Sequence, residues 1–232
     1  MSRLRLASYN VHKCLGTDGR RLPGRVLDVV NALGADIVAL QEADRRMGPR
    51  PAALPRRLVE EASDFAPVEA EGFGPSLGFH GNAVLLRRGI EPREVHGIAL
   101  PGLEPRGALL VEAEAASGPL RVIAVHLGLR RRDRVRQIAA IRAALAARAP
   151  MPTVVMGDFN EWSRLKGLEG LGGYEVLAPG RSFHTLHPLG HLDRIALGEG
   201  IAARDAGVAD TALARRASDH LPVWADVGVP AA

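Results

Sequence analysis

Polar clusters stand where apolar runs of the sequence stop or start, from the first tenth of the chain to its last. A lone Asp or Glu beside an apolar run is usually a loop residue or a helix cap. Six such clusters in one chain instead favour a shared site at a sheet edge. The clusters contain Asn10, Glu42, His126, Asp158 with Asn160, Asp193, and Asp219 with His220.

These residue types suit the hydrolysis of a phosphate ester assisted by Mg²⁺ or Mn²⁺. Such hard cations prefer oxygen ligands and keep several waters, and Glu42, Asp219 and Asn10 offer oxygens of that kind. Negative charge that rearranges in the transition state needs electrostatic stabilisation, which Asn160 and His126 could supply beside a metal. The attacking water needs a positioned acceptor, and the candidates for that role are Asp158 and the pair formed by His220 and Asp193.

Apolar patterning predicts alternating strands and helices that would position these clusters. Strands are predicted at 3–11, 36–41, 83–87, 108–113, 120–126, 153–157, 193–197 and 221–227. Helices are predicted at 25–33, 52–62 and 132–148, the last with Val135, Ile138, Ile141 and Leu145 on one face. No repeat, low-complexity tract or linker interrupts the pattern, so one α/β domain over residues 1–232 is the simplest account.

Composition narrows the class of protein. With 47% hydrophobic and 24% charged residues, the chain resembles an ordinary globular protein. A net charge of +4 suits an anionic substrate but is a small excess for nucleic-acid binding, and 4% aromatic residues leave little for base stacking. Neither a signal peptide nor an apolar stretch of membrane-spanning length is visible, so we expect a cytoplasmic protein. The single cysteine, Cys14, excludes an internal disulfide, and we do not expect it to be a nucleophile.

The motifs YNVHK, DIVALQEADRR, HGNAVLL, AVHLG, VVMGDFNEW, HLDRI and SDHLPVWADV occur in this order along the chain. Their order and form resemble the endonuclease/exonuclease/phosphatase superfamily, and the closest match in form is to small bacterial members of undefined substrate. The resemblance runs from about residue 5 to residue 227. It implies a four-layer α/β sandwich in which two packed mixed β-sheets are flanked by helices.

The resemblance also implies a role for each residue. Glu42 would be the main metal ligand, with Asn10 beside it and Asp219 contacting the metal or its water. Asp158 would activate or orient the attacking water, and Asn160 would contact the scissile phosphate. His220, held by Asp193, would contact phosphate or move a proton, and His126 would stabilise the phosphate from the opposite side or assist the leaving group. The choice of general base between Asp158 and His220 stays open.

Further residues have two interpretations each. His12 and Lys13 are expected to touch phosphate, although a strand end can also leave them solvated. Asn82 either orients a catalytic residue or ties two loops together. Three histidines in one segment are expected to form a rim or lid over the cleft rather than a zinc site, and they are His184, His187 and His191. The arginine run at 130–136 is expected to be the solvated start of a helix rather than a landing strip for a polyanion, and Trp162 and Trp224 are expected to pack.

Three functions compete at this stage. The first is a metal-dependent phosphodiester hydrolase that acts on nucleic acid, a lipid headgroup or a small diester. The second is a phosphomonoesterase for a phosphorylated lipid or sugar, and the third is a non-catalytic binding module on the same fold. The partner in each case is a phosphoester, and nucleic acid is one possible source of it. The oligomeric state stays open.

Overall fold

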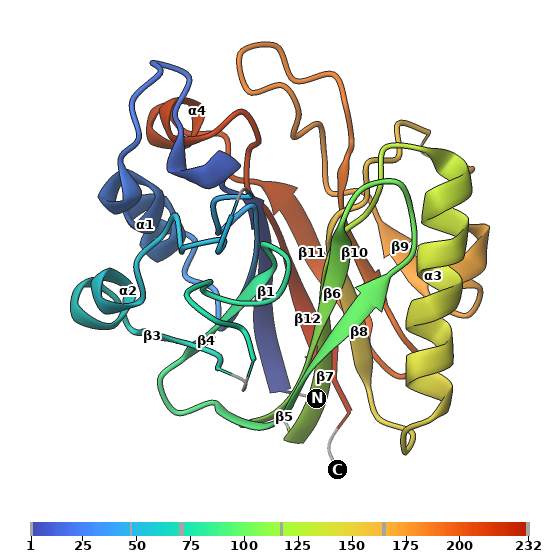
Figure 1. The fold of residues 1–232 in the computed structure, drawn as a ribbon. Coiled ribbons are helices and arrows are strands. Elements are labelled where there is room, and N and C mark those ends of the chain that lie inside the picture. The colour runs from blue at the N-terminus through green and yellow to red at the C-terminus, as the bar shows by residue number, and fades with distance from the viewer. Residues whose placement is uncertain (1, 47, 70–71, 117, 164–165, 231–232) are drawn as a thin grey trace.

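Two six-stranded mixed sheets pack face to face, and helices cover their outer faces, which gives four layers (Figure 1). The computed structural model describes residues 2–46, 48–69, 72–116, 118–163 and 166–230. This architecture confirms the predicted four-layer α/β sandwich. Both chain termini lie at one end of the sandwich, so β1 runs away from them toward the opposite edge.

The first sheet has the strand order β11-β12-β1-β2-β4-β3. Only its central pair, β1 and β2, is parallel, and the other neighbours are antiparallel. The strands are β1 (Ser2–Asn10), β2 (Ile37–Gln41), β3 (Phe65–Pro67), β4 (Ala83–Arg87), β11 (Ala202–Val208) and β12 (Val223–Val229).

The second sheet has the strand order β5-β6-β7-β8-β10-β9, and its central pair, β7 and β8, is again the parallel one. Its strands are β5 (Glu91–Leu100), β6 (Arg106–Ala115), β7 (Gly118–His126), β8 (Thr153–Asp158), β9 (Glu175–Leu177) and β10 (Asp193–Leu197). The two sheets therefore share one plan, with a parallel pair at the centre of each.

Helices α1 (Pro23–Ala32), α2 (Arg56–Ala62) and α4 (Ala212–Ala217) lie on the first sheet, and α3 (Arg131–Ala146) lies on the second (Figure 1). Short 3₁₀ turns occur at His12–Cys14 and Glu169–Leu171. The predicted buried face of α3 is partly wrong, because Val135 is 53% exposed while Arg134 and Gln137 are buried. The two polar side chains face inward because Arg134 pairs with buried Glu161, and Gln137 accepts from the amide of Gly128.

Three apolar layers hold the sandwich together. The central one lies between the sheets and takes alternate residues of the strands, such as Leu4 and Leu6 of β1 and Val122 and Ala124 of β7. The other two lie under the helices and take the intervening residues, because successive side chains of a strand point to opposite faces. The part of the chain that the structure describes holds no helix long and apolar enough to cross a membrane.

Predicted and observed elements agree best for buried strands. The predictions at 83–87 and 193–197 match β4 and β10 in both bounds. Strands β3, β5, β9 and β11 and helix α4 were not predicted. Strands β5 and β11 are largely exposed sheet edges, so their sequences lack the apolar run on which the prediction relied.

Candidate functional site

Strand direction brings the polar clusters to one edge of the sandwich, away from the termini. Strands β1, β2, β7 and β8 end at this edge, with Asn10 paired to Gln41 and His126 paired to Asp158. Strands β10 and β12 run the opposite way, so they begin there, and Asp193 pairs with Asp158. Residues from both ends of the chain thus meet at this edge because they stand at the ends or starts of strands.

Alternation along the strands then directs these side chains into the space between the sheets. In β8 the central apolar layer takes Val154 and Met156, and Asp158 is the next residue in that series. The same count of two leads from Ala124 to His126. Asn10 and Asp193 continue the inward series of their own strands in the same way. A period of two therefore extends the apolar interior into a polar cluster at its end.

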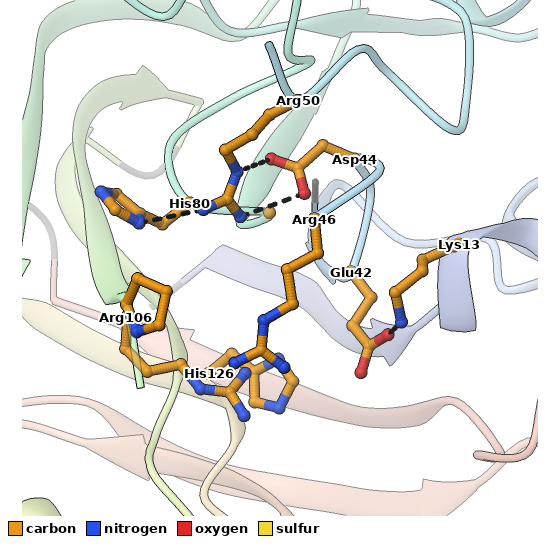
Figure 2. Close-up of a pocket in the computed structure, with 10 residues that line it drawn as sticks. Lys13, Glu42, Asp44, Arg46, Arg50, His80, Arg106 and His126 are labelled. Atoms are coloured by element: carbon orange, nitrogen blue, oxygen red, sulfur yellow. Dashed lines mark hydrogen bonds and ion pairs between the residues drawn. The ribbon is translucent and has the colours of Figure 1, made fainter. Parts of the chain in front are cut away.

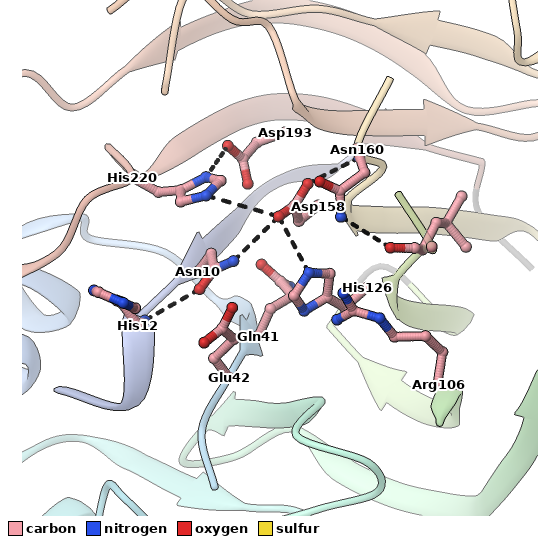
Figure 3. Close-up of polar contacts among 12 residues, drawn as sticks. Asn10, His12, Gln41, Glu42, Arg106, His126, Asp158, Asn160, Asp193 and His220 are labelled. Atoms are coloured by element: carbon pink, nitrogen blue, oxygen red, sulfur yellow. Dashed lines mark hydrogen bonds and ion pairs between the residues drawn. The ribbon is translucent and has the colours of Figure 1, made fainter. Parts of the chain in front are cut away.

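Asp158 is the centre of this cluster (Figure 3). Its Oδ2 accepts a hydrogen bond from Nδ2 of Asn10 at 3.1 Å, and it lies 3.4 Å from Nε2 of His126 and 3.7 Å from Nε2 of His220. Its Oδ1 accepts from the backbone amide of Asn160 at 2.9 Å. Because Asp158 is only 2% exposed, one buried carboxylate gathers side chains from both sheets.

Asp193 contacts Nδ1 of His220, on the side of the ring away from the nitrogen that approaches Asp158. Oδ2 of Asp193 lies 2.9 Å from Nδ1 of His220 and accepts from Oγ of Ser182 at 2.5 Å. Burial by itself lowers the pKa of His220, but the carboxylate of Asp193, followed by that of Asp158, outweighs burial and raises the pKa to about 10. His220 is therefore an imidazolium at neutral pH, with Nε2 turned toward Asp158.

The other two titrating groups are set by burial. Burial raises the pKa of Asp158 to about 6, against the opposing charge of His220. Burial also lowers the pKa of His126 well below its usual range, and the positive charge of Arg106 acts in the same direction. At neutral pH the cluster thus holds an ionised carboxylate, with a neutral imidazole 3.4 Å and an imidazolium 3.7 Å from it.

Glu42 and Asp219 lie at the more open side of the cluster. The Glu42 carboxylate pairs with the ammonium of Lys13, and Oδ1 of Asp219 lies 3.6 Å from Nδ1 of His12. Each carboxylate is 23% exposed. Burial acts to raise the pKa of Glu42, but Lys13 outweighs it and holds the pKa below its usual range. The Glu42 carboxylate is therefore ionised at neutral pH.

The backbone at this edge is strained at several of the predicted site residues. Glu42 and Asn160 follow strand ends with φ of 54° and 50°, in the left-handed region that non-glycine residues rarely adopt. His12 and Lys13 share that conformation. Such conformations cost about 1–3 kcal/mol each and persist mainly where surrounding structure imposes them, which is common at functional sites.

A basic pocket adjoins Glu42 and His126 (Figure 2). One wall holds Arg50, whose guanidinium donates to both oxygens of Asp44, at 2.9 and 3.1 Å, and lies 3.2 Å from Nδ1 of His80. The remaining charged residues of the pocket are Lys13, Arg46 and Arg106. Cations outnumber carboxylates in this lining, so the pocket favours an anionic group beside the cluster.

The structure and the sequence point to different sets of side chains for a metal ion. Within the described ranges, Asp158, Asp193 and His220 form the group whose ligand atoms all lie within 4.8 Å of one another. Oδ1 of Asp193 is buried without a hydrogen-bond partner, so its lone pairs are available to a metal ion. The set predicted from the sequence is the second one, and its members are Asn10, Glu42 and Asp219.

The remaining residues considered from the sequence are Asn82, Cys14 and the three histidines at 184, 187 and 191. Asn82 is fully buried, and its Nδ2 donates to the carbonyl of Gly107 at 2.8 Å, which ties the first sheet to the second. This contact favours the structural interpretation of Asn82. Burial raises the pKa of the Cys14 thiol to about 12, so it is protonated, as expected for a residue without a nucleophilic role. The three histidines at 184, 187 and 191 belong to no metal-binding group among the described residues.

Of the two tryptophans expected to pack, Trp224 does so and Trp162 does not. Trp224 is half-buried beneath the guanidinium of Arg5, which lies 4.5 Å from its ring centre. Trp162 is 61% exposed and meets Phe183 edge to face at 6.1 Å, so its prediction as a packing residue is wrong for most of its surface. Trp162 lies four residues beyond the end of β8, after the chain has left the sheet.

Two residues near the cluster were not found from the sequence. Arg106 begins β6, which is antiparallel to β7, so the start of β6 lies at the same edge as His126. A hairpin prediction over 91–115 would have placed it there. Ser182 supports Asp193, but it lies in an irregular segment whose fold no local pattern of the sequence indicates.

Comparisons with known proteins agree with this geometry. The sequence profile of the Endonuclease/Exonuclease/phosphatase family matches residues 7–220. The uncharacterized protein YbhP of Escherichia coli K12 is 33% identical over 250 residues, which cover 96% of this chain and 95% of YbhP. The structure of D. rerio TDP2 with a single-strand DNA product is similar with a TM-score of 0.72 at 18% identity, over 99% of this chain and all of the other. A mannosyl-6-phosphatase of Bacteroides thetaiotaomicron is similar with a TM-score of 0.74 at 17% identity, over 97% and 99% of the two chains.

Proposed function

This chain belongs to the endonuclease/exonuclease/phosphatase family, and on that premise we propose that residues 1–232 form one catalytic domain, a divalent-metal-dependent phosphodiester hydrolase. The observation that carries the proposal is the convergence on Asp158 of Asn10, His126 and His220 from strands of both sheets. Phosphoryl transfer needs positioned charges more than covalent chemistry from the protein. A buried carboxylate beside an imidazolium supplies such charges.

Asp158 is the proposed acceptor for the proton of the attacking water. Its pKa of about 6 leaves it ionised at neutral pH, yet close enough to that range to accept a proton during reaction. The amide of Asn10 and the backbone amide of Asn160 fix both of its oxygens. The carboxylate thus keeps one orientation toward the water.

The imidazolium of His220 is the proposed contact to the phosphate oxygens or the proton donor to the leaving group. Asp193 holds its ring through Nδ1, which leaves Nε2 as the donor. His126, neutral at pH 7, would contact the phosphate from the second sheet. The side-chain amide of Asn160 donates to the carbonyl of Leu127, the residue that follows His126, and is thereby held beside it. The basic pocket would take the part of a diester beyond the scissile phosphorus.

Glu42, Asn10 and Asp219 are the proposed ligands for Mg²⁺ or Mn²⁺. Their side-chain oxygens are hard ligands of the kind these ions prefer. The ammonium of Lys13 pairs with the Glu42 carboxylate, which supports Glu42 as a residue that stabilises a positive charge. The bound ion would neutralise charge on the phosphoryl oxygens. Calorimetric titration with Mn²⁺ separates the two candidate metal sets, because Glu42→Gln should abolish binding whereas Asp193→Asn should leave it within about threefold.

The proposal is tested by hydrolysis of bis(p-nitrophenyl) phosphate with Mg²⁺ or Mn²⁺. We expect turnover that EDTA removes, and a loss of at least roughly 10³-fold in kcat for Asp158→Asn. Turnover that survives EDTA, or that Asp158→Asn leaves intact, would overturn it. The fold is shared by a protein solved in complex with a single-strand DNA product and by a mannosyl-6-phosphatase. Parallel assays on p-nitrophenyl phosphate, single-stranded DNA and a sugar phosphate would therefore separate diester from monoester preference.

A further inference from the structure

The most exposed large apolar side chains of the described residues all lie at the site edge of the second sheet. They are Leu103 and Leu189, each 69% exposed, Leu129 at 65%, Trp162 at 61% and Leu186 at 57%. Single exposed leucines are ordinary on a protein surface. Four leucines and a tryptophan on neighbouring loops at one end of the molecule are not explained in that way. We call these five residues the apolar rim.

Contacts between the loops make the apolar rim one surface. The β5–β6 turn approaches the start of α3, where the amide of Leu103 lies 3.5 Å from Oδ2 of Asp133. Arg134 of α3 donates to the carbonyl of Leu129 at 2.7 Å and pairs with Glu161, the neighbour of Trp162, at 2.6 Å. These contacts, one buried and two partly buried, connect the first three loops.

The β9–β10 connection completes the surface. It rises above the strand ends in Figure 1 and carries Leu186 and Leu189. Phe183 at its base meets both the ring of Trp162 and, at 4.8 Å, the ring of His220. The apolar rim therefore begins one aromatic contact away from the catalytic cluster.

Exposed arginines adjoin the apolar rim at Leu129. Arg130, Arg131 and Arg132 follow Leu129 directly and are exposed, as is Arg136 one turn further along α3. Two acidic groups contact these arginines: Glu169 lies 3.3 Å from Arg131, and the buried Asp133 lies 3.9 Å from Arg132. The surface thus combines projecting apolar side chains with an excess of arginine.

We infer that the apolar rim and its arginines dock this protein on an anionic phospholipid surface. Apolar side chains that enter the boundary between headgroups and acyl chains, flanked by arginines that meet lipid phosphates, are the chemistry of peripheral membrane binding. A protein partner would instead favour a flat apolar centre depleted of charge. Docking in this orientation turns the cluster around Asp158 toward the lipid headgroups. That the substrate is then a phosphoester presented at a lipid surface rests on the proposed function, whereas the docking does not.

Co-sedimentation with sucrose-loaded vesicles tests the docking. We expect the protein to bind vesicles of phosphatidylcholine mixed with phosphatidylglycerol and to bind pure phosphatidylcholine much less, with affinity falling as salt rises. The double variant Leu129→Ser/Leu189→Ser should lose at least roughly tenfold in affinity. Arg130→Ser/Arg132→Ser should lose roughly 10- to 30-fold. These side chains are exposed, so the thermal melting of the variants should match that of the unchanged protein.

The matched control is Arg57→Ser/Arg93→Ser, which removes the same charge from exposed positions in α2 and at the start of β5, away from the apolar rim. It should bind as the unchanged protein does. Absence of vesicle binding overturns the inference, and so does binding that needs the arginines but not the leucines, which would indicate a simple polyanion surface. Measuring binding with Asp158→Asn keeps the two proposals apart, because docking would persist in that variant even if no turnover were found for the unchanged protein.

Discussion

Gly157 allows β7 and β8 to approach each other beside the catalytic cluster, and replacing it with alanine tests this directly. It precedes Asp158 and opposes Val125 of β7. A Cβ at this position would overlap the carbonyl oxygen of Val125, and it would lie 2.8 Å from the carbonyl carbon and 2.9 Å from Cγ2. Unstrained carbon contacts lie at about 3.5–4.0 Å.

The clash has no inexpensive relief. Both strands are internal to the sheet, so neither can move outward without breaking ladder hydrogen bonds on its other side. Parting the strands by roughly 1 Å should cost about 3–5 kcal/mol in the free energy of unfolding, a large share of the ~5–15 kcal/mol typical of a domain. With a urea dependence of ~2–3 kcal/mol per molar, the unfolding midpoint should fall by roughly 1–2 M.

Urea unfolding followed by circular dichroism measures this effect without knowledge of the substrate. The matched control is Gly24→Ala in α1, where a Cβ would meet no atom within 4 Å. Alanine is the better helix former, so this variant should keep its stability or gain up to about 1 kcal/mol. Adding Val125→Ala to Gly157→Ala should not restore stability, because the main clash is with the backbone. A Gly157→Ala protein within about 1 kcal/mol of the original would refute the reasoning.

Three further predictions concern ionised groups. The pKa of Asp226, held at about 2 by its arginine partners, lies below its unfolded value of 3.8, so its stabilisation is present above pH 4 and lost as pH falls toward 2. Asp226→Asn should therefore destabilise by about 1–2 kcal/mol at pH 7 and by almost nothing near pH 2 in denaturant titrations. Asp193→Asn should lower kcat by roughly 10²–10⁴-fold because His220 loses its orienting carboxylate, and an unchanged rate would contradict that role. Arg134→Met should cost about 3–5 kcal/mol in thermal unfolding because it leaves Glu161 buried without its cation, and Arg134→Met/Glu161→Leu should recover much of the loss.

Local pattern was sufficient for much of the fold. The buried strands β4, β8 and β10 were predicted within one residue because each contains a short apolar run, such as Val154–Met156 in β8 and Ile195–Leu197 in β10. The exposed edge strands β5 and β11 were not, because their stability comes from pairing with a neighbour rather than from their own composition. On α3 the pattern correctly placed Ile138 and Ile141 in the core, but it also placed Val135 there. Val135 is exposed, and Arg134 is buried instead, paired with Glu161.

The sequence by itself determined which groups are available at the site and the face on which they stand. Asp158 and His126 each continue an apolar series with a period of two, and that period is a local property of a strand. The order of the family motifs was equally visible without coordinates.

Only the tertiary structure decided that these groups meet, and with what charge. The contact between Asn10 and Asp158 joins residues 148 positions apart, so it exists only once the two sheets are packed. The raised pKa of Asp158 and the lowered pKa of His126 come from burial, which no stretch of sequence possesses alone. The apolar rim is likewise a property of the packed molecule, because Leu103, Leu129 and Trp162 become neighbours only where loops of one sheet come together at its edge.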